Sequence, residues 1–140
     1  MTYKDCFTKG LLRKGSITEE ETKAQIDIAN AYITKAEKIF ESEVFDMSFL
    51  ASYISIFHSA RALLYSKGHK ERSHYCLFEF VKQEFENDFE IKRMAEIGQN
   101  YRESRHMVQY EGDLCSEDAA KEAIIDAKKF FELAKAKITK

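Results

Sequence analysis

Residues 50–64 read LASYISIFHSARALL, and this run decides the fold class of the chain. Its apolar positions follow helical steps of three and four residues: Leu50, Tyr53, Ile54, Phe57, Ala60 and Leu64. A strand would instead alternate apolar and polar side chains. Gly68 follows the run, and glycine readily adopts the left-handed backbone that ends a helix. Asp46, directly before this segment, is expected to cap its start. The run therefore predicts a helix over residues 47–67.

Further helices are predicted on either side of this run. Thr18-Glu19-Glu20-Glu21 has the form of a capping box, in which side chains bond the free amides of a helix start. An apolar stripe from Ile26 to Phe40 comes directly after it. Ser73 and Ser116 can cap two more helices. One additional helix is expected from Phe89 to about Tyr110.

The chain has 140 residues and no proline, the residue that most strongly interrupts a helix interior. Short connections between long amphipathic helices favour antiparallel neighbours, because each apolar stripe must be buried against another. We therefore predict an all-α fold, an up-and-down antiparallel bundle of four to five helices. The length suits one domain over residues 1–140, with residues 1–15 as an N-terminal extension.

Composition favours a soluble protein of the cytoplasm. The most apolar run is too short and too polar to cross a bilayer, so no membrane association is expected. Cys6, Cys76 and Cys115 are odd in number and widely spaced, which fits reduced thiols. Histidine and cysteine spacings match no metal site, so we expect neither metal nor cofactor. A net charge of −2 excludes a chain that is basic throughout.

The second half of the helix that starts near Phe89 carries the best candidate site. Arg102, His106 and Tyr110 follow one another at intervals of four residues, so one helical face carries all three. Arg105 and Gln109 lie beside that face. Arginine pairs with phosphate and histidine titrates near neutral pH, which suits RNA binding or cleavage. Alternatively, the group only pairs with glutamates across the bundle.

Chemical roles can be assigned to these residues. Arg102 and His106 are the candidate catalytic pair, with histidine moving the proton and arginine stabilising charge on the phosphoryl group. Arg105, Gln109 and Tyr110 are candidate ligand-binding residues. His58 and Arg61, on the apolar run, form a second candidate pair for ligand binding. A lone histidine there is otherwise a core residue with a hydrogen-bond partner.

Two stretches resemble small archaeal and bacterial HEPN-domain proteins, in a branch known as an uncharacterised protein family. Residues 53–64, with Gly68 and His74 behind them, resemble its run Tyr-x-x-x-Phe-His-x-Ala-Arg-Ala-Leu-Leu…Gly…His. The sequence RxxRxxVQY at residues 102–110 resembles its ending RxxRxxADY, with valine and glutamine as departures. The resemblance covers most of residues 17–137.

This resemblance implies a fold and a set of partners. HEPN domains are helical bundles that often form dimers, and many belong to toxin–antitoxin or defence modules beside a minimal nucleotidyltransferase. We therefore predict a homodimeric module that binds nucleotide or RNA, a nucleotidyltransferase partner, or both. The alternatives are an active metal-independent endoribonuclease and a non-catalytic structural interaction module.

The spacing of arginine and histidine differs from that of active members, in which four to six residues separate the two. Three residues separate Arg102 from His106 here. In the family register, Arg105 is followed by Tyr110 at the position of the base, and a tyrosine with a pKa of about 10 is a poor base at neutral pH. Binding without cleavage and cleavage by His106 are therefore both retained.

Overall fold

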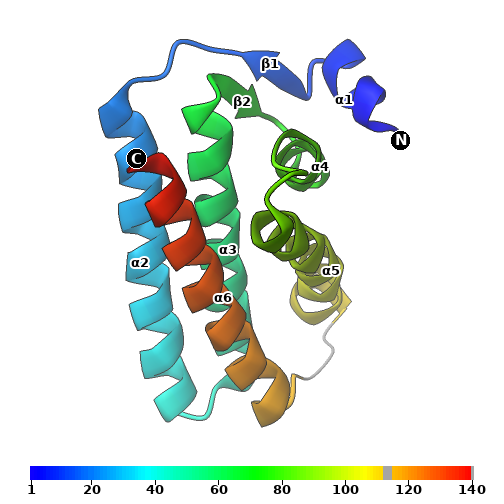
Figure 1. The fold of residues 1–140 in the computed structure, drawn as a ribbon. Helices are drawn as coiled ribbons and strands as arrows, with labels where there is room; N and C mark the ends of the chain where they lie inside the picture. Colours follow the sequence, from blue (N-terminus) through cyan, green and yellow to red (C-terminus); the bar gives the residue numbers. More distant parts are fainter. Residues whose placement is uncertain (112–114, 140) are drawn as a thin grey trace.

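The computed structural model describes residues 1–111 and 115–139, apart from the side chains of Tyr110 and Glu111. The elements in this part are α1 (Tyr3–Thr8), β1 (Leu12–Lys14), α2 (Glu19–Glu41), α3 (Phe45–Ser66), β2 (His69–Glu71), α4 (His74–Glu84), α5 (Phe89–Glu111) and α6 (Glu117–Ile138). The predicted all-α helical bundle is confirmed, with α2 to α6 as its long helices (Figure 1). Within the described residues, none of the helices has both the length and the apolar character needed to cross a membrane.

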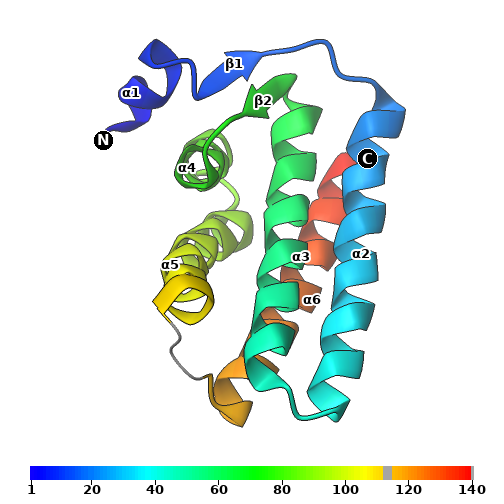
Figure 2. The ribbon, with the colours of Figure 1, turned by 180° about the vertical axis from the view of Figure 1, so that it is seen from behind.

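Helix α3 lies at the centre of the bundle. It packs against α2 and α6 on one side and against α4 and α5 on the other. Helices α2, α3 and α6 run alongside one another, whereas α4 and α5 cross them and are seen nearly end-on (Figures 1 and 2). This crossing brings the start of α4 and the second half of α5 against the middle of α3.

Small buried side chains let α2 and α3 approach closely. Ser48 and Ser55 of α3 are fully buried, and each hydroxyl donates to a backbone carbonyl of α2. The acceptors are Ala36 and Ala29, each at 2.8 Å. Because a buried hydroxyl without a partner costs free energy, these bonds help to fix the register of the two helices.

Local capping explains most of the helix starts. Thr18 closes the expected capping box, and Ser73 and Ser116 accept from backbone amides three residues on. Gly68 has the expected positive φ of 71° just after α3. The expectation that Asp46 caps α3 is wrong, because α3 already begins at Phe45 without a side-chain cap.

The N-terminal extension over residues 1–15 contains both a short helix, α1, and a strand, β1. Strand β1 pairs antiparallel with β2, with Leu12 opposite Glu71 and Lys14 opposite His69. This ladder was not expected, because strands of three residues are too short to show an alternating pattern. It attaches the start of the chain to the connection between α3 and α4.

A disulfide joins the same region to α4. Cys6 and Cys76 are bonded, with their Cα atoms 5.7 Å apart, and both side chains are fully buried. The expectation of reduced thiols is therefore wrong for this pair, whereas Cys115 is free. A sequence separation of 70 residues gave no local sign of the pairing.

Candidate phosphate-binding site

Two arginines of α5 turn toward aromatic rings of the neighbouring helices. Cζ of Arg105 lies 5.3 Å from the ring centre of Tyr53 on α3. Cζ of Arg102 lies 5.6 Å from the ring centre of Tyr75 on α4. Nε of Arg105 is buried and has no hydrogen-bond partner among the described residues. Arg105 therefore presents a positive charge that is not neutralised by any described ion pair.

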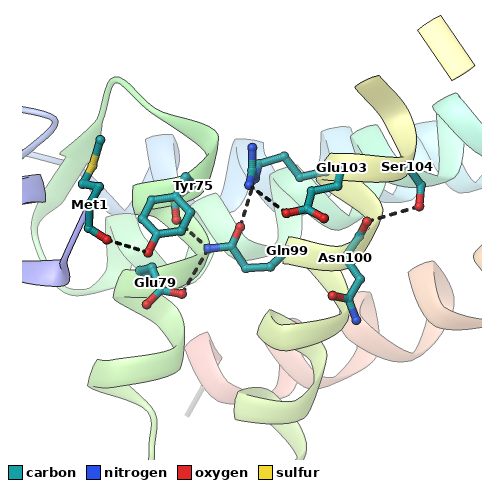
Figure 3. Close-up of polar contacts among 8 residues, drawn as sticks. Met1, Tyr75, Glu79, Gln99, Asn100, Glu103 and Ser104 are labelled. Atoms are coloured by element: carbon teal, nitrogen blue, oxygen red, sulfur yellow. Dashed lines mark hydrogen bonds and ion pairs between the residues drawn. The ribbon is translucent and has the colours of Figure 1, made fainter. Parts of the chain in front are cut away.

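A chain of polar contacts that runs from Met1 through Tyr75 to Gln99 (Figure 3) sets the position of Arg102. The hydroxyl of Tyr75 donates to the carbonyl of Met1 at 3.2 Å. Nε2 of Gln99 donates to the carbonyl of Tyr75 at 2.8 Å, and Nε of Arg102 donates to Oε1 of Gln99 at 3.0 Å. Oε1 of Glu103 lies 3.8 Å from Nη2 of Arg102, and because the Glu103 side chain is 77% exposed, this long pair is screened by water and leaves most of the positive charge available.

His74 is the first residue of α4 and lies next to these arginines. Its ring stacks on Phe57 with a centre separation of 4.3 Å, and its Nδ1 lies 2.7 Å from the hydroxyl of Tyr53. Burial and the positive charges of nearby arginines, Arg105 first among them, lower the pKa of His74 to about 4. His74 is therefore neutral at physiological pH.

Arg61 of α3 is held by the small ladder. Its Nε and Nη2 donate to the two carboxylate oxygens of Glu71 at 3.0 and 2.7 Å. The Glu71 side chain is only 6% exposed, so this bidentate pair is mostly shielded from water. Cζ of Arg61 lies 4.6 Å from the ring centre of Phe57. Glu71 thus neutralises the guanidinium group of Arg61 and fixes its plane, whereas Arg102 and Arg105 have no such partner among the described residues.

His58 lies one turn before Arg61 and faces α2. Its Nδ1 lies 2.6 Å from Oε1 of Gln25, and its ring stacks on Tyr32 with a centre separation of 6.4 Å. Burial, followed by the charges of Arg61 and His74, lowers the pKa of His58 to about 4. A second neutral imidazole therefore adjoins the arginines.

We call this group the cationic cluster, and its members are Arg61, Arg102, Arg105, His58 and His74. These residues come from three helices. The guanidinium groups of Arg102 and Arg105 are not paired with a buried carboxylate in the described part of the chain, so an anion is the ligand that would complement them. Among the described residues, no group of three or more histidine, cysteine and acidic side chains could hold a metal ion.

The structure brings several sequence-based candidates together and leaves others apart. Arg61, Arg102, Arg105 and His58 all lie in the cationic cluster. His106 and Gln109 are exposed on α5, and the side chain of Tyr110 lies outside the described residues, so their proposed roles stay predictions.

His74 was not among the sequence-based site residues. Its signals were the Ser73 cap directly before it and its place in the family resemblance. Neither signal could reveal that α4 crosses α3 at Phe57 and Tyr53.

An apolar hollow lies elsewhere, between α3, α5 and α6. Its volume is about 620 Å³, and its lining includes Phe49, Tyr101, Met107 and Val108. No member of the cationic cluster lines it. The hollow and the charged site are therefore separate features on different sides of the Arg102–Arg105 segment.

Comparison with known proteins identifies the family of this chain. The sequence profile of the HEPN domain matches residues 22–137. The chain belongs to the HEPN domain family. It is also 30% identical, over 129 residues, to a protein of Methanocaldococcus jannaschii named "Putative toxin MJ0605". That alignment covers 91% of this chain and 94% of the other protein.

The HEPN match covers the whole cationic cluster. It includes α2 from Thr22 onward and all of α3 to α5, so every arginine and histidine of the cluster lies inside it. Helix α1 and strand β1 precede the HEPN match, although β1 pairs with the strand that carries Glu71. Residues before the matched region therefore support a residue pair within it.

Proposed function

We propose that this chain is a toxin-like HEPN module that binds RNA or a nucleotide through a phosphate group at the cationic cluster. Arg105 and Arg102 pair with the phosphate oxygens, and His74 adds a hydrogen bond. Arg61, already paired with Glu71, contributes to the positive field. His106 and Gln109, exposed on the same helix, contact a longer RNA.

The single observation that supports this proposal most strongly is the state of Arg105. Its Nε is buried without a partner among the described residues, and its guanidinium group packs on Tyr53. A buried charged group that lacks a hydrogen-bond partner costs free energy, and a bound phosphate would remove that cost. Arginine is also the residue best suited to pair with phosphate in two parallel hydrogen bonds.

Titration of a fluorescent single-stranded RNA by anisotropy tests the proposal. We expect Arg105→Ala and Arg102→Ala each to weaken binding by about tenfold to a hundredfold, because each removes a charge-assisted hydrogen bond. Each substitution should also reduce the steepness of the dependence of log affinity on log salt by about 0.7, the value for one lost phosphate contact on a single strand.

Arg93→Ala is the matched control, because Arg93 is an exposed arginine of the same helix. It removes the same charge outside the cluster and should change affinity less than twofold. Loss of affinity as large in Arg93→Ala as in Arg105→Ala would refute a localised site. Absence of RNA and nucleotide binding by the unaltered protein would refute the proposal itself.

A metal-independent endoribonuclease is the second candidate, favoured by two neutral imidazoles beside guanidinium groups. A neutral imidazole can accept a proton from a ribose hydroxyl. Cleavage of single-stranded RNA in the presence of EDTA tests this function, with His58→Ala, His74→Ala and the sequence-based candidate His106→Ala compared in the same assay. RNA left intact by the unaltered protein rules the activity out, and equal cleavage by one variant removes that histidine from the mechanism.

The likeness to a protein named as a toxin supports a further proposal, a partner that restrains the module. We propose a homodimer that associates with an antitoxin of the minimal nucleotidyltransferase class. Co-expression with the product of the adjacent gene, followed by light scattering on the purified material, tests both points. A protein that is monomeric and co-purifies with no partner would contradict both the dimer and the antitoxin partner.

A further inference from the structure

A disulfide ties the N-terminal extension, residues 1–15, to the helical bundle. Cys6 of α1 is bonded to Cys76 in the first turn of α4, and both side chains are fully buried. The extension precedes the HEPN match, which begins at residue 22, so the region that defines the family does not include it. The disulfide therefore links a segment outside the family domain to a helix that carries part of the cationic cluster.

The non-covalent attachments of the extension are individually weak. The hydroxyl of Tyr3 donates to Glu84 at 3.1 Å and the hydroxyl of Tyr75 donates to the carbonyl of Met1 at 3.2 Å, and water has access to both bonds. Strand β1 has three residues, and a two-stranded ladder is marginally stable by itself. Ordering the whole extension costs more conformational entropy than a few such bonds return, although burial of Leu12 offsets part of that cost. The covalent link therefore contributes strongly to keeping the extension in place.

The extension supports two arginines of the cationic cluster. Strand β1 pairs with β2, whose Glu71 holds Arg61 by two hydrogen bonds. The carbonyl of Met1 accepts from the hydroxyl of Tyr75, and the guanidinium group of Arg102 packs on that ring. Release of the extension would remove a partner from Tyr75 and open the Glu71–Arg61 pair to water, so both arginines would lose a fixed position. A site binds more weakly when the ligand must order its groups.

The disulfide lies against the first residue of the chain. Sδ of Met1 is 3.8 Å from Sγ of Cys76, and the Met1 side chain is 61% exposed. A terminal residue with an exposed side chain moves away at a low cost in free energy. We therefore expect displacement of Met1 to give a thiolate in solution access to Sγ of Cys76.

We propose that the Cys6–Cys76 disulfide is a redox switch, in which reduction by a dithiol releases the N-terminal extension and weakens RNA binding at the cationic cluster. This regulation rests on the proposed phosphate binding. One thiolate of the reductant attacks Sγ of Cys76, and the electron pair of the S–S bond leaves with Sγ of Cys6, which takes up a proton. The second thiol of the reductant then displaces Cys76, which is protonated in turn, and the reductant is left as a disulfide.

Limited digestion with trypsin detects release of the extension without any ligand. The extension carries exposed cleavage sites at Lys4, Lys9 and Arg13, and α2 carries exposed sites at Lys23 and Lys35. Because trypsin cuts a segment that has opened locally, reduction with dithiothreitol should speed cleavage within the extension by about tenfold or more. Cleavage at the α2 sites should be unchanged. Equal rates of cleavage within the extension before and after reduction would overturn the inference.

Titration of fluorescent single-stranded RNA measures the effect on the cationic cluster. We expect the reduced protein to bind about threefold to tenfold more weakly than the oxidised protein, the range for loss of one hydrogen bond. Cys6→Ser should bind like the reduced protein with or without dithiothreitol. Cys115→Ser is the matched control, because Cys115 is free, and it should keep the full response to reduction.

The outcomes separate this inference from the proposed function. Equal RNA affinity of the oxidised and reduced forms would overturn the switch and leave phosphate binding standing. A response to dithiothreitol in Cys6→Ser as large as in the unaltered protein would also overturn it, because the response would then not come from this disulfide. If the serine variant does not fold, the oxidised and reduced forms of Cys115→Ser give the same comparison. If RNA binds to neither form, the switch and the proposed function both fail.

Discussion

The hydroxyl of Tyr53 lies 2.7 Å from Nδ1 of His74, and this bond joins the centre of α3 to the first residue of α4. Tyr53→Phe removes the hydroxyl and leaves the half-buried nitrogen of His74 without its donor. We expect the free energy of unfolding to fall by about 1 kcal/mol, the typical loss for one such bond. Urea denaturation measures the change.

Tyr65→Phe is the control for that experiment, since no hydrogen bond is described for the Tyr65 hydroxyl, and it should leave stability unchanged. Because the buried hydroxyl of Tyr53 donates to Nδ1 of His74, the proton of the neutral imidazole is on Nε2. In Tyr53→Phe this proton should cease to reside mainly on Nε2, as seen by nitrogen-15 NMR. Unchanged stability together with an unchanged tautomer would show that the bond does not hold the imidazole.

Stability should depend on pH below neutrality because of the two histidines in the cluster. Burial and nearby positive charges lower the pKa values of His58 and His74 to about 4, whereas an unfolded histidine titrates near 6.5. Between pH 6.5 and 4 the unfolded chain therefore binds protons that the folded chain does not. The free energy of unfolding must fall as the pH decreases through this window.

Urea denaturation at pH 7, 6 and 5 measures this slope. The carboxyl groups of Asp5, Glu21 and Asp88, whose pKa values are lowered, add their own losses only at more acidic pH. The double variant His58→Gln, His74→Gln should accordingly show a flatter dependence between pH 6.5 and 5. If the double variant keeps the original slope, the pH dependence of the free energy of unfolding comes from groups other than these two histidines.

The disulfide between Cys6 and Cys76 should contribute strongly to stability. It closes a loop with a sequence separation of 70 residues, for which chain entropy predicts about 4 kcal/mol. We expect reduction or Cys6→Ser to lower the melting temperature, and Cys115→Ser, which alters the free cysteine, to leave it unchanged. Thiol titration of the unfolded, unreduced protein should detect Cys115 alone, and detection of all three cysteines would contradict the pairing.

Helix positions were predictable because their signals are local. The capping box at Thr18 and the caps at Ser73 and Ser116 each involve residues within three positions of one another. Apolar side chains at helical spacing then mark the buried face. Asp46 shows the limit of this reasoning, because a good capping residue lies inside α3 while Val44, before the helix, offers no side-chain cap.

The contacts that build the candidate site are between residues far apart in sequence. Tyr53 and His74 are 21 positions apart, and Arg105 joins them only because α5 crosses α3. The β1–β2 ladder and the disulfide are non-local in the same way. The residue types alone predicted that the arginines of α5 bind a phosphate. That His74 is the imidazole beside them follows only from the packing of α4 on Phe57.

Gly98 shows how packing overrides helix propensity. A Cβ atom at this position would overlap ring carbons of Phe78, which is fully buried. Alanine should stabilise the helix interior by about 1 kcal/mol relative to glycine, but overpacking costs about 1–3 kcal/mol. We therefore expect Gly98→Ala to lower the free energy of unfolding, as measured by urea denaturation.

Asn100→Ala on the same helix is the matched control, because Asn100 is exposed and its replacement adds helix propensity without a clash. Its stability should be equal to or slightly above that of the unaltered protein. Adding Phe78→Leu to Gly98→Ala should cost less than Phe78→Leu alone, since the smaller side chain makes room for the new methyl group. If the two substitutions are instead additive, the glycine is not required by close contact with Phe78.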